Sequence, residues 1–224
     1  MPIGTPVDLG FGGVLTGSSF TITTTDNIAT GDLVPVMVVV GSGHSPVSSI
    51  TDGTNSYVLD GTFVPSNDME VWDAISSGLV PAGSGIVVNN PDAAATMVGT
   101  ACHVTGIAQV SPYDSGGAAT GNGTGTNASV TTGTLAQASE IILAYTIFPA
   151  TSTFTEDPNF TTLSQPNALG LVLSTSYLIV SSTAPVTYAP SFNAPTTNWA
   201  IFLAPFKGLA PSDTFANSQM LLVM

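Results

Sequence analysis

The chain has 224 residues, of which one is basic and fourteen are acidic, so its formal net charge at pH 7 is −13. Nucleic acids and anionic membrane surfaces are bound largely through Lys and Arg, so this composition argues against both kinds of partner. Only 7% of the residues are charged whereas 43% are hydrophobic, so we expect a surface of neutral hydroxyl and amide groups. Such a surface has few long side chains to immobilise, which favours close contacts between proteins. A compositional bias of the genome or an acidic host is the alternative explanation for this unusual composition.

A chain of this length can bury one substantial hydrophobic core. We expect one β-sandwich domain over residues 19–208, an N-terminal arm over 1–18 and a C-terminal tail over 209–224. The single cysteine, Cys102, cannot form an intrachain disulfide. The first residues show no basic segment followed by an apolar stretch, which predicts synthesis in the cytoplasm without a signal peptide. The longest apolar runs, such as 33–40, are far shorter than the roughly 20 residues of a membrane-spanning helix.

Short runs rich in Val, Ile, Thr, Tyr and Phe are separated by Gly, Pro, Asn and Asp, a pattern typical of an all-β sandwich or barrel. Residues 20–23 alternate apolar and polar side chains, whereas 33–40 and 140–148 are nearly continuous apolar runs, which predicts strands that are buried on both sides or lie under a loop. We expect two sheets in a jelly-roll-like topology, with an immunoglobulin-like Greek key as the alternative. The predicted strands are 19–24, 33–40, 48–51, 56–59, 69–74, 85–88, 96–105, 128–132, 140–148, 169–180 and 198–206.

Two segments fall outside these strands. Residues 111–126 are rich in glycine, and we expect them to form an exposed loop. Their glycine spacing does not predict a nucleotide site, because no helix start and no lysine follow it. The C-terminal tail ends in apolar residues, which would be unfavourable in water. It is expected to pack on its own domain or to dock on a neighbouring subunit through Leu221, Leu222, Val223 and Met224.

Five carboxylates lie between residues 52 and 73 without a balancing cation. A hairpin turn is predicted at 52–55, and two of the acids share one face of a predicted strand. Calcium binds carboxylate, amide and backbone oxygens in such loops, so this segment is a candidate calcium site, although the spacing matches no EF-hand and Asp is an ordinary turn residue. A glycosidase pair of carboxylates is a further alternative that no other feature supports. The candidate ligands are Asp52, Asp60, Asp68, Glu70 and Asp73.

The residue types that most enzymes use at a reacting centre are scarce, so no catalytic residue and no other cofactor are predicted. His44 lies in a loop without a particular serine partner. Cys102 and His103 are adjacent in a predicted strand, so their side chains should point to opposite faces and cannot form a catalytic pair. One cysteine and two separated histidines also lack the usual spacing of zinc ligands.

Aromatic side chains are possible platforms for a carbohydrate, a ligand that suits a β-sandwich. Trp72 and Trp199 lie among apolar residues in predicted strands, where core packing is the expected use. Tyr113, beside the glycine-rich segment, is expected to be exposed and is the candidate glycan contact.

Four segments, 49–57, 70–74, 128–134 and 199–208, carry a degenerate pattern of turns and strands that resembles β-sandwich proteins of tailed bacteriophages. This resemblance spans roughly residues 20–208 and assigns no catalytic residue. It implies a non-enzymatic virion protein, a capsid-decoration or fibre-type subunit on the outer surface of the particle. Such a subunit is expected to form a homo-oligomer and to contact capsid or tail proteins. The alternative is a carbohydrate-binding or host-adhesion module.

Overall fold

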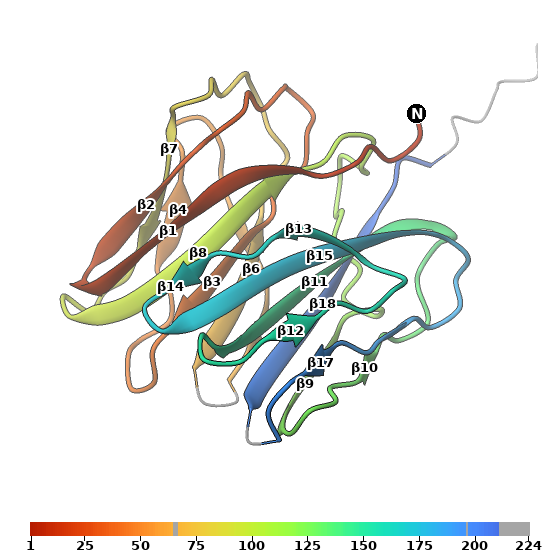
Figure 1. Ribbon diagram of the computed structural model, residues 1–224. Helices are drawn as coiled ribbons and strands as arrows, with labels where there is room; N and C mark the ends of the chain where they lie inside the picture. The colour runs from red at the N-terminus through yellow and green to blue at the C-terminus, as the bar shows by residue number, and fades with distance from the viewer. Residues whose placement is uncertain (65–66, 196, 211–224) are drawn as a thin grey trace, which may run out of the picture.

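A computed structural model describes residues 1–64, 67–195 and 197–210, and these residues form antiparallel β-strands and no helix (Figure 1). The all-β prediction is therefore confirmed. The described part of the chain holds no helix that is long and apolar enough to cross a membrane. In chain order the strands are β1 (Val7–Gly17), β2 (Ser19–Thr23), β3 (Val36–Val40), β4 (Ser49–Thr51), β5 (Val58–Phe63), β6 (Asp68–Asp73), β7 (Gly85–Asn89), β8 (Ala95–His103), β9 (Ala119–Thr124), β10 (Val130–Thr131), β11 (Ser139–Pro149), β12 (Phe154–Thr155), β13 (Thr161–Ser164), β14 (Asn167–Ala168), β15 (Leu171–Ser181), β16 (Thr187–Tyr188), β17 (Ser191–Phe192) and β18 (Asn198–Lys207).

The described strands form stacked layers (Figure 1). The outer sheet has the order β2-β7-β4, and the central sheet has the order β1-β8-β3-β6-β5. The C-terminal sheet has the order β13-β15-β11-β18-β9, and β14 also pairs with β15. Two short strand pairs, β10 with β16 and β12 with β17, contribute apolar side chains to the far face of the C-terminal sheet. Each pair of adjacent layers encloses its own apolar core.

This layering explains the continuous apolar runs in the sequence. All five residues of β3 are buried, and alternate side chains enter different cores: Val38 faces the outer sheet, whereas Met37 faces the C-terminal sheet. In β11, Leu143 faces the central sheet and Ile142 faces the short strand pairs. A strand between two apolar layers has no solvent-facing side, so it does not alternate polar and apolar residues. The prediction that 33–40 and 140–148 contain strands buried on both sides is confirmed.

Two predictions about irregular segments are wrong. Residues 7–17 do not form an arm: they are β1, which pairs with β8 and buries Leu9 completely. Within the segment expected to be an exposed loop, Ala119–Thr124 is β9, the edge strand beside β18. Both strands are rich in glycine, which sequence patterns associate with loops. The tail residues predicted to form an interface, Leu221, Leu222, Val223 and Met224, lie outside the described residues.

All pairings between named strands occur within one of two stretches of the described chain. Strands β1 to β8 pair only among themselves, and β9 to β18 pair only among themselves. The two stretches meet through side chains in the core between the central and C-terminal sheets. Residues near the N-terminus also reach the end of β18, because the side chain of Ile3 lies against Gly208.

Candidate functional site

A pocket of about 430 Å³ lies where β9, β11, β15 and β18 bring their ends together. Its volume falls within the roughly 300–1,000 Å³ of typical small-molecule sites. The amide side chains of Asn122 and Asn198 come from the C-terminal sheet, and that of Asn67 comes from the turn before β6. Trp199 and Phe148 also border the pocket, but their rings pack on the other face of the C-terminal sheet, toward the short strand pairs. None of the described residues that line this pocket is charged, so it suits a neutral ligand.

The position of Trp199 explains Gly123 in β9. Trp199 pairs directly with Gly123 in the antiparallel register of β18 and β9. A Cβ atom at Gly123 would lie 2.8 Å from Cζ2 and 3.1 Å from Cε2 of the indole. The ring therefore lies against the backbone of the edge strand, where an aromatic side chain compensates for the one that glycine lacks. The indole is partly buried and packs against the core on this face of the sheet, so the expected core packing of Trp199 is confirmed.

A smaller hollow of about 70 Å³ shares Asn67 and Leu171 with this pocket. It is lined by residues of the central sheet and by Leu169. Leu169 and Gly170 form the turn between β14 and β15, with φ values of 56° and 80°. A leucine in this left-handed region is uncommon. The turn holds this apolar side chain, which is 36% exposed, beside the hollow.

A pair of carboxyl groups, Asp60 and Asp73, lies between the central and C-terminal sheets. Asp60 is the extra residue of a β-bulge where β5 pairs with β6, and Asp73 ends β6. Burial, and then repulsion by Asp73, raise the pKa of Asp60 far above its ordinary value. Burial also raises the pKa of Asp73, while its hydrogen bond with Asp60 lowers it. Two adjacent buried carboxyls share a proton more readily than they both ionise.

Glu70 faces the opposite side of the central sheet and acts as a buried acceptor. Its Oε1 accepts a hydrogen bond from the backbone N–H of Val47, and its Oε2 accepts one from Nε1 of Trp72, both at 2.8 Å. Burial raises the pKa of Glu70, and these two hydrogen bonds lower it. Trp72 is therefore part of the core, as expected.

Asp52 closes the predicted turn at 52–55. Its Oδ1 accepts hydrogen bonds from the backbone N–H groups of Thr54 and Asn55 at 2.9 and 2.7 Å, and its Oδ2 accepts one from the hydroxyl of Tyr57 at 3.1 Å. These contacts confirm the turn. They also occupy the oxygens that a metal ion would need.

The structure does not bring the five predicted calcium ligands together in one site. Asp52 lies in its turn, Asp60 and Asp73 lie between two sheets, and Asp68 and Glu70 share the other face of β6. Side chains alternate along a strand, which separates Glu70 from Asp73. In residues 1–64, 67–195 and 197–210, no three His, Cys, Asp or Glu side chains form a group that could hold a metal ion.

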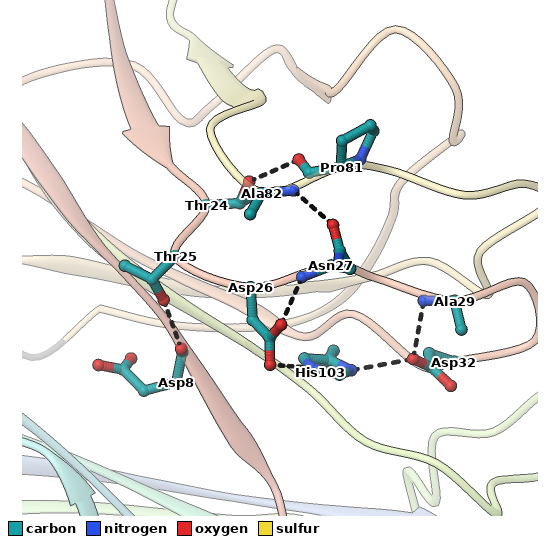
Figure 2. Close-up of polar contacts among 10 residues, drawn as sticks. All are labelled: Asp8, Thr24, Thr25, Asp26, Asn27, Ala29, Asp32, Pro81, Ala82 and His103. Atoms are coloured by element: carbon teal, nitrogen blue, oxygen red, sulfur yellow. Dashed lines mark hydrogen bonds and ion pairs between the residues drawn. The ribbon is translucent and has the colours of Figure 1, made fainter.

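His103, at the end of β8, lies between two aspartates in Figure 2. Its Nδ1 is 2.9 Å from Oδ2 of Asp32, and its Nε2 is 3.9 Å from Oδ2 of Asp26. Asp32 also accepts a hydrogen bond from the backbone N–H of Ala29 at 3.0 Å. The imidazole thus links β8 to the loop that precedes β3. Cys102 is buried in the core on the other face, so the prediction that these two side chains diverge is confirmed.

The nearest charged group to His44 is a carboxylate. Its Nδ1 is 3.8 Å from Oδ2 of Asp92, and the hydroxyl of Ser45 donates to Oδ1 of the same carboxylate at 3.2 Å. In a serine nucleophile the hydroxyl would instead donate to the imidazole. Asp92 is better described as a cap for this loop, since it also accepts the backbone N–H of Ser45.

Tyr113 is not the exposed aromatic that the sequence suggested. It is half-buried and packs against Phe206, with 5.6 Å between the ring centroids. Burial, and then the charges of Asp60 and Asp114, raise its pKa. Trp199 borders the pocket through its place in β18, and its indole packs against the core on the other face of that sheet.

Lys207, the sole basic residue of the sequence, lies opposite Glu140 in the register of β11 and β18. Glu140 is fully buried, and its Oε1 accepts the backbone N–H of Gln137 at 2.9 Å. Burial raises the pKa of Glu140, whereas that hydrogen bond and, less strongly, Lys207 lower it. The single cation therefore lies beside a buried carboxylate.

Compared with known proteins, the chain matches no protein-family model, no curated protein and no solved structure.

Proposed function

We propose that the chain is a non-enzymatic virion structural protein, a capsid-decoration or fibre-type subunit on the outer surface of a phage particle. In this role it forms a homo-oligomer and contacts capsid or tail proteins. The observation that carries the proposal is the exposure of apolar side chains at both edges of the central sheet.

The first of these edges is β1. Phe11 and Leu15 occupy alternating positions on this strand and are 52% and 66% exposed. At the opposite edge, on β5, Val58 and Leu59 are 61% and 41% exposed. Clustered apolar side chains on a surface favour burial against another protein. Edge strands are also the usual places where sheets associate.

The composition supports the same role. Neutral polar side chains cost little conformational entropy when they are immobilised in a contact. A chain with one basic residue and a net charge of −13 would be repelled by a packaged genome, which favours the outside of a shell. The all-β sandwich architecture is compatible with the phage proteins that the sequence resembles.

The oligomeric state of the purified chain tests this proposal. Size-exclusion chromatography with light scattering is expected to give a multiple of the 22.6 kDa chain mass. The double substitution Phe11→Glu, Leu15→Glu places two charges on the apolar edge and should shift the protein to the monomer. The matched control is Leu79→Glu, because Leu79 is 63% exposed but lies outside β1 and β5.

Association with particles is the second measurement. Purified virions from the source of this sequence should contain the chain, and the double variant should be lost from them. Weak subunit contacts form at about 100 μM. The proposal is refuted if the chain stays monomeric at this concentration and is absent from particles.

A further inference from the structure

We propose that the pocket at the ends of β9, β11, β15 and β18 is the docking site for the C-terminal tail of a neighbouring copy of the chain. The part of the tail that enters the pocket is the apolar run 220–224. Residues 211–224 lie outside the described part of the chain. This docking rests on the proposed homo-oligomer, to which it adds a second contact between subunits.

The pocket is the open end of the core between the central and C-terminal sheets. Ile147 and Ala200, which lie opposite each other on β11 and β18, belong to that core and line the pocket. Asn122 lies opposite Ala200 on β9, and Asn198 lies two residues before Ala200, so both amides project from the same face of the sheet. Apolar core residues therefore form the floor of the pocket, and asparagines lie around it.

The smaller hollow beside the pocket extends this apolar floor. It is lined by Val39 and Val98, which belong to the same core on the side of the central sheet. It shares Asn67 and Leu171 with the pocket, so the two spaces are adjacent. Leu169 also lines it and is 36% exposed. An apolar segment bound here would continue the core of the domain and remove these side chains from water.

The sequence of the tail matches the chemistry of the pocket. Residues 220–224 read Met-Leu-Leu-Val-Met and carry no charged side chain, and no described lining residue is charged either. An asparagine amide both donates and accepts hydrogen bonds, so it can pair with the backbone of an extended peptide. Asn198 is already oriented for this role, because its Oδ1 accepts a hydrogen bond from the hydroxyl of Thr124 at 2.7 Å. Its NH₂ group is then directed to other acceptors.

The place where the tail leaves the domain favours the pocket of a neighbour. β18 begins at the pocket with Asn198 and ends at Lys207, at the end of the domain where the N-terminus lies (Figure 1). These ends are about 30 Å apart at roughly 3.3 Å per residue. From Ala210 to Met220 the chain spans at most about 33–36 Å when fully extended. The tail would therefore need a nearly straight path to its own pocket, whereas a neighbour can bring its pocket close to the start of the tail.

This contact is expected to be weak between separate chains. Subunits that are already joined through β1 would hold each tail near a pocket at an effective concentration in the millimolar range. A dissociation constant of about 100 μM is then enough to fill the pocket in the oligomer. The Phe11→Glu, Leu15→Glu variant should still dissociate at low micromolar concentration, although its tail is intact.

A peptide of residues 215–224, acetylated, amidated and fluorescently labelled, tests the docking without requiring assembly. It is titrated with the full-length Leu221→Asp, Leu222→Asp protein, called the tail variant, whose own tail cannot compete for the pocket. Fluorescence polarisation should give a dissociation constant of about 100 μM. The same peptide with aspartate at both leucine positions should not bind.

Substitutions in the tail variant then locate the binding site. Leu171→Asp places a charge on the wall of the pocket and should weaken peptide binding tenfold or more. Asn198→Asp nearly keeps the shape of the side chain, removes its NH₂ donor and should weaken binding several-fold. Leu79→Asp is the matched control, because Leu79 is 63% exposed and does not line the pocket, so affinity should be unchanged. Circular dichroism checks that each variant is folded.

Mixing two variants tests whether the tail enters a neighbour, and both carry Phe11→Glu, Leu15→Glu to remove the β1 contact. The tail variant has a pocket but no apolar tail, and Leu171→Asp has the tail but a charged pocket. Analytical ultracentrifugation at about 500 μM, above the expected dissociation constant, should show a 1:1 complex in the mixture and monomers of each variant alone.

The docking is overturned if the peptide does not bind at about 1 mM, the limit of weak specific contacts. It is also overturned if both folded pocket variants keep full affinity, or if the mixture stays monomeric, as it would when each tail docks on its own chain. Failure of the proposed function is distinct: the wild-type chain would be monomeric and absent from particles while the peptide still binds.

Discussion

The Asp60–Asp73 pair should make the protein less stable as the pH rises, and Asp73→Asn should remove much of that loss. Asp73 is 6% exposed, and burial raises its pKa from 3.8 to about 6. The folded state therefore binds this proton more tightly than the unfolded state does. The stability that the protonated group provides is complete below about pH 4 and is lost as the pH rises to about 6 and beyond.

The size of the effect follows from the shift in pKa. One pKa unit corresponds to about 1.4 kcal/mol, so ionising Asp73 in the folded protein costs up to about 3 kcal/mol by pH 8. Asparagine has nearly the same shape and cannot ionise. Asp73→Asn should therefore have about the wild-type free energy of unfolding at pH 4, and should exceed it by up to about 3 kcal/mol at pH 8.

Urea denaturation at pH 4, 5, 6, 7 and 8, followed by circular dichroism, measures this difference. Asp52→Asn is the control, because it removes a carboxylate from the same region of the sequence but not from the pair. The control should show the same dependence on pH as the wild type. If Asp73→Asn and the wild type lose stability in parallel between pH 4 and pH 8, the interpretation of Asp73 as a destabilising buried acid is wrong.

Three further substitutions or treatments test the packing. Gly123→Ala would place a methyl group against Trp199 and should lower the free energy of unfolding by about 1–3 kcal/mol, measured by urea denaturation. Glu70→Ala leaves two buried N–H donors, one of them on Trp72, without an acceptor and should cost about 3–5 kcal/mol in the same assay, whereas Glu70→Gln should cost less. Trypsin should cut the chain once at most, after Lys207, the sole basic residue. Because Lys207 is paired in β18, cleavage should be slow before denaturation. Mass spectrometry of the products would reveal any second site.

The buried strands were predictable because their environment is uniform. A strand such as β11, enclosed between two apolar cores, shows its burial directly as a long apolar run. The strands β1 and β9 were not predictable in this way. In both, glycine is required by a neighbour that lies far away in the sequence: a Cβ atom at Gly13 would lie 2.9 Å from the carbonyl oxygen of Met97, and one at Gly123 would meet Trp199. Local composition contains no sign of these contacts.

The candidate sites are formed by a β-bulge and by strand ends that meet in the fold, and sequence patterns do not reveal either feature. Strand alternation correctly placed Asp68 and Glu70 on one face of β6. The bulge that brings Asp60 to Asp73 has no such signature, so the five acids were read as one group when they form several. The pocket lies at strand ends from four parts of the chain, and only the tertiary arrangement brings these ends together.

The separation of strand pairings between β1–β8 and β9–β18 has a consequence for biosynthesis. The outer and central sheets can complete their hydrogen bonds as soon as β8 has left the ribosome. At that moment the central sheet would still present Met37, Val39 and Met69 to water, because the C-terminal sheet that covers them is not yet made. Such a half-finished chain is prone to aggregate. Fragments divided between β8 and β9 should each keep whole sheets and should restore the native protein only when they are mixed.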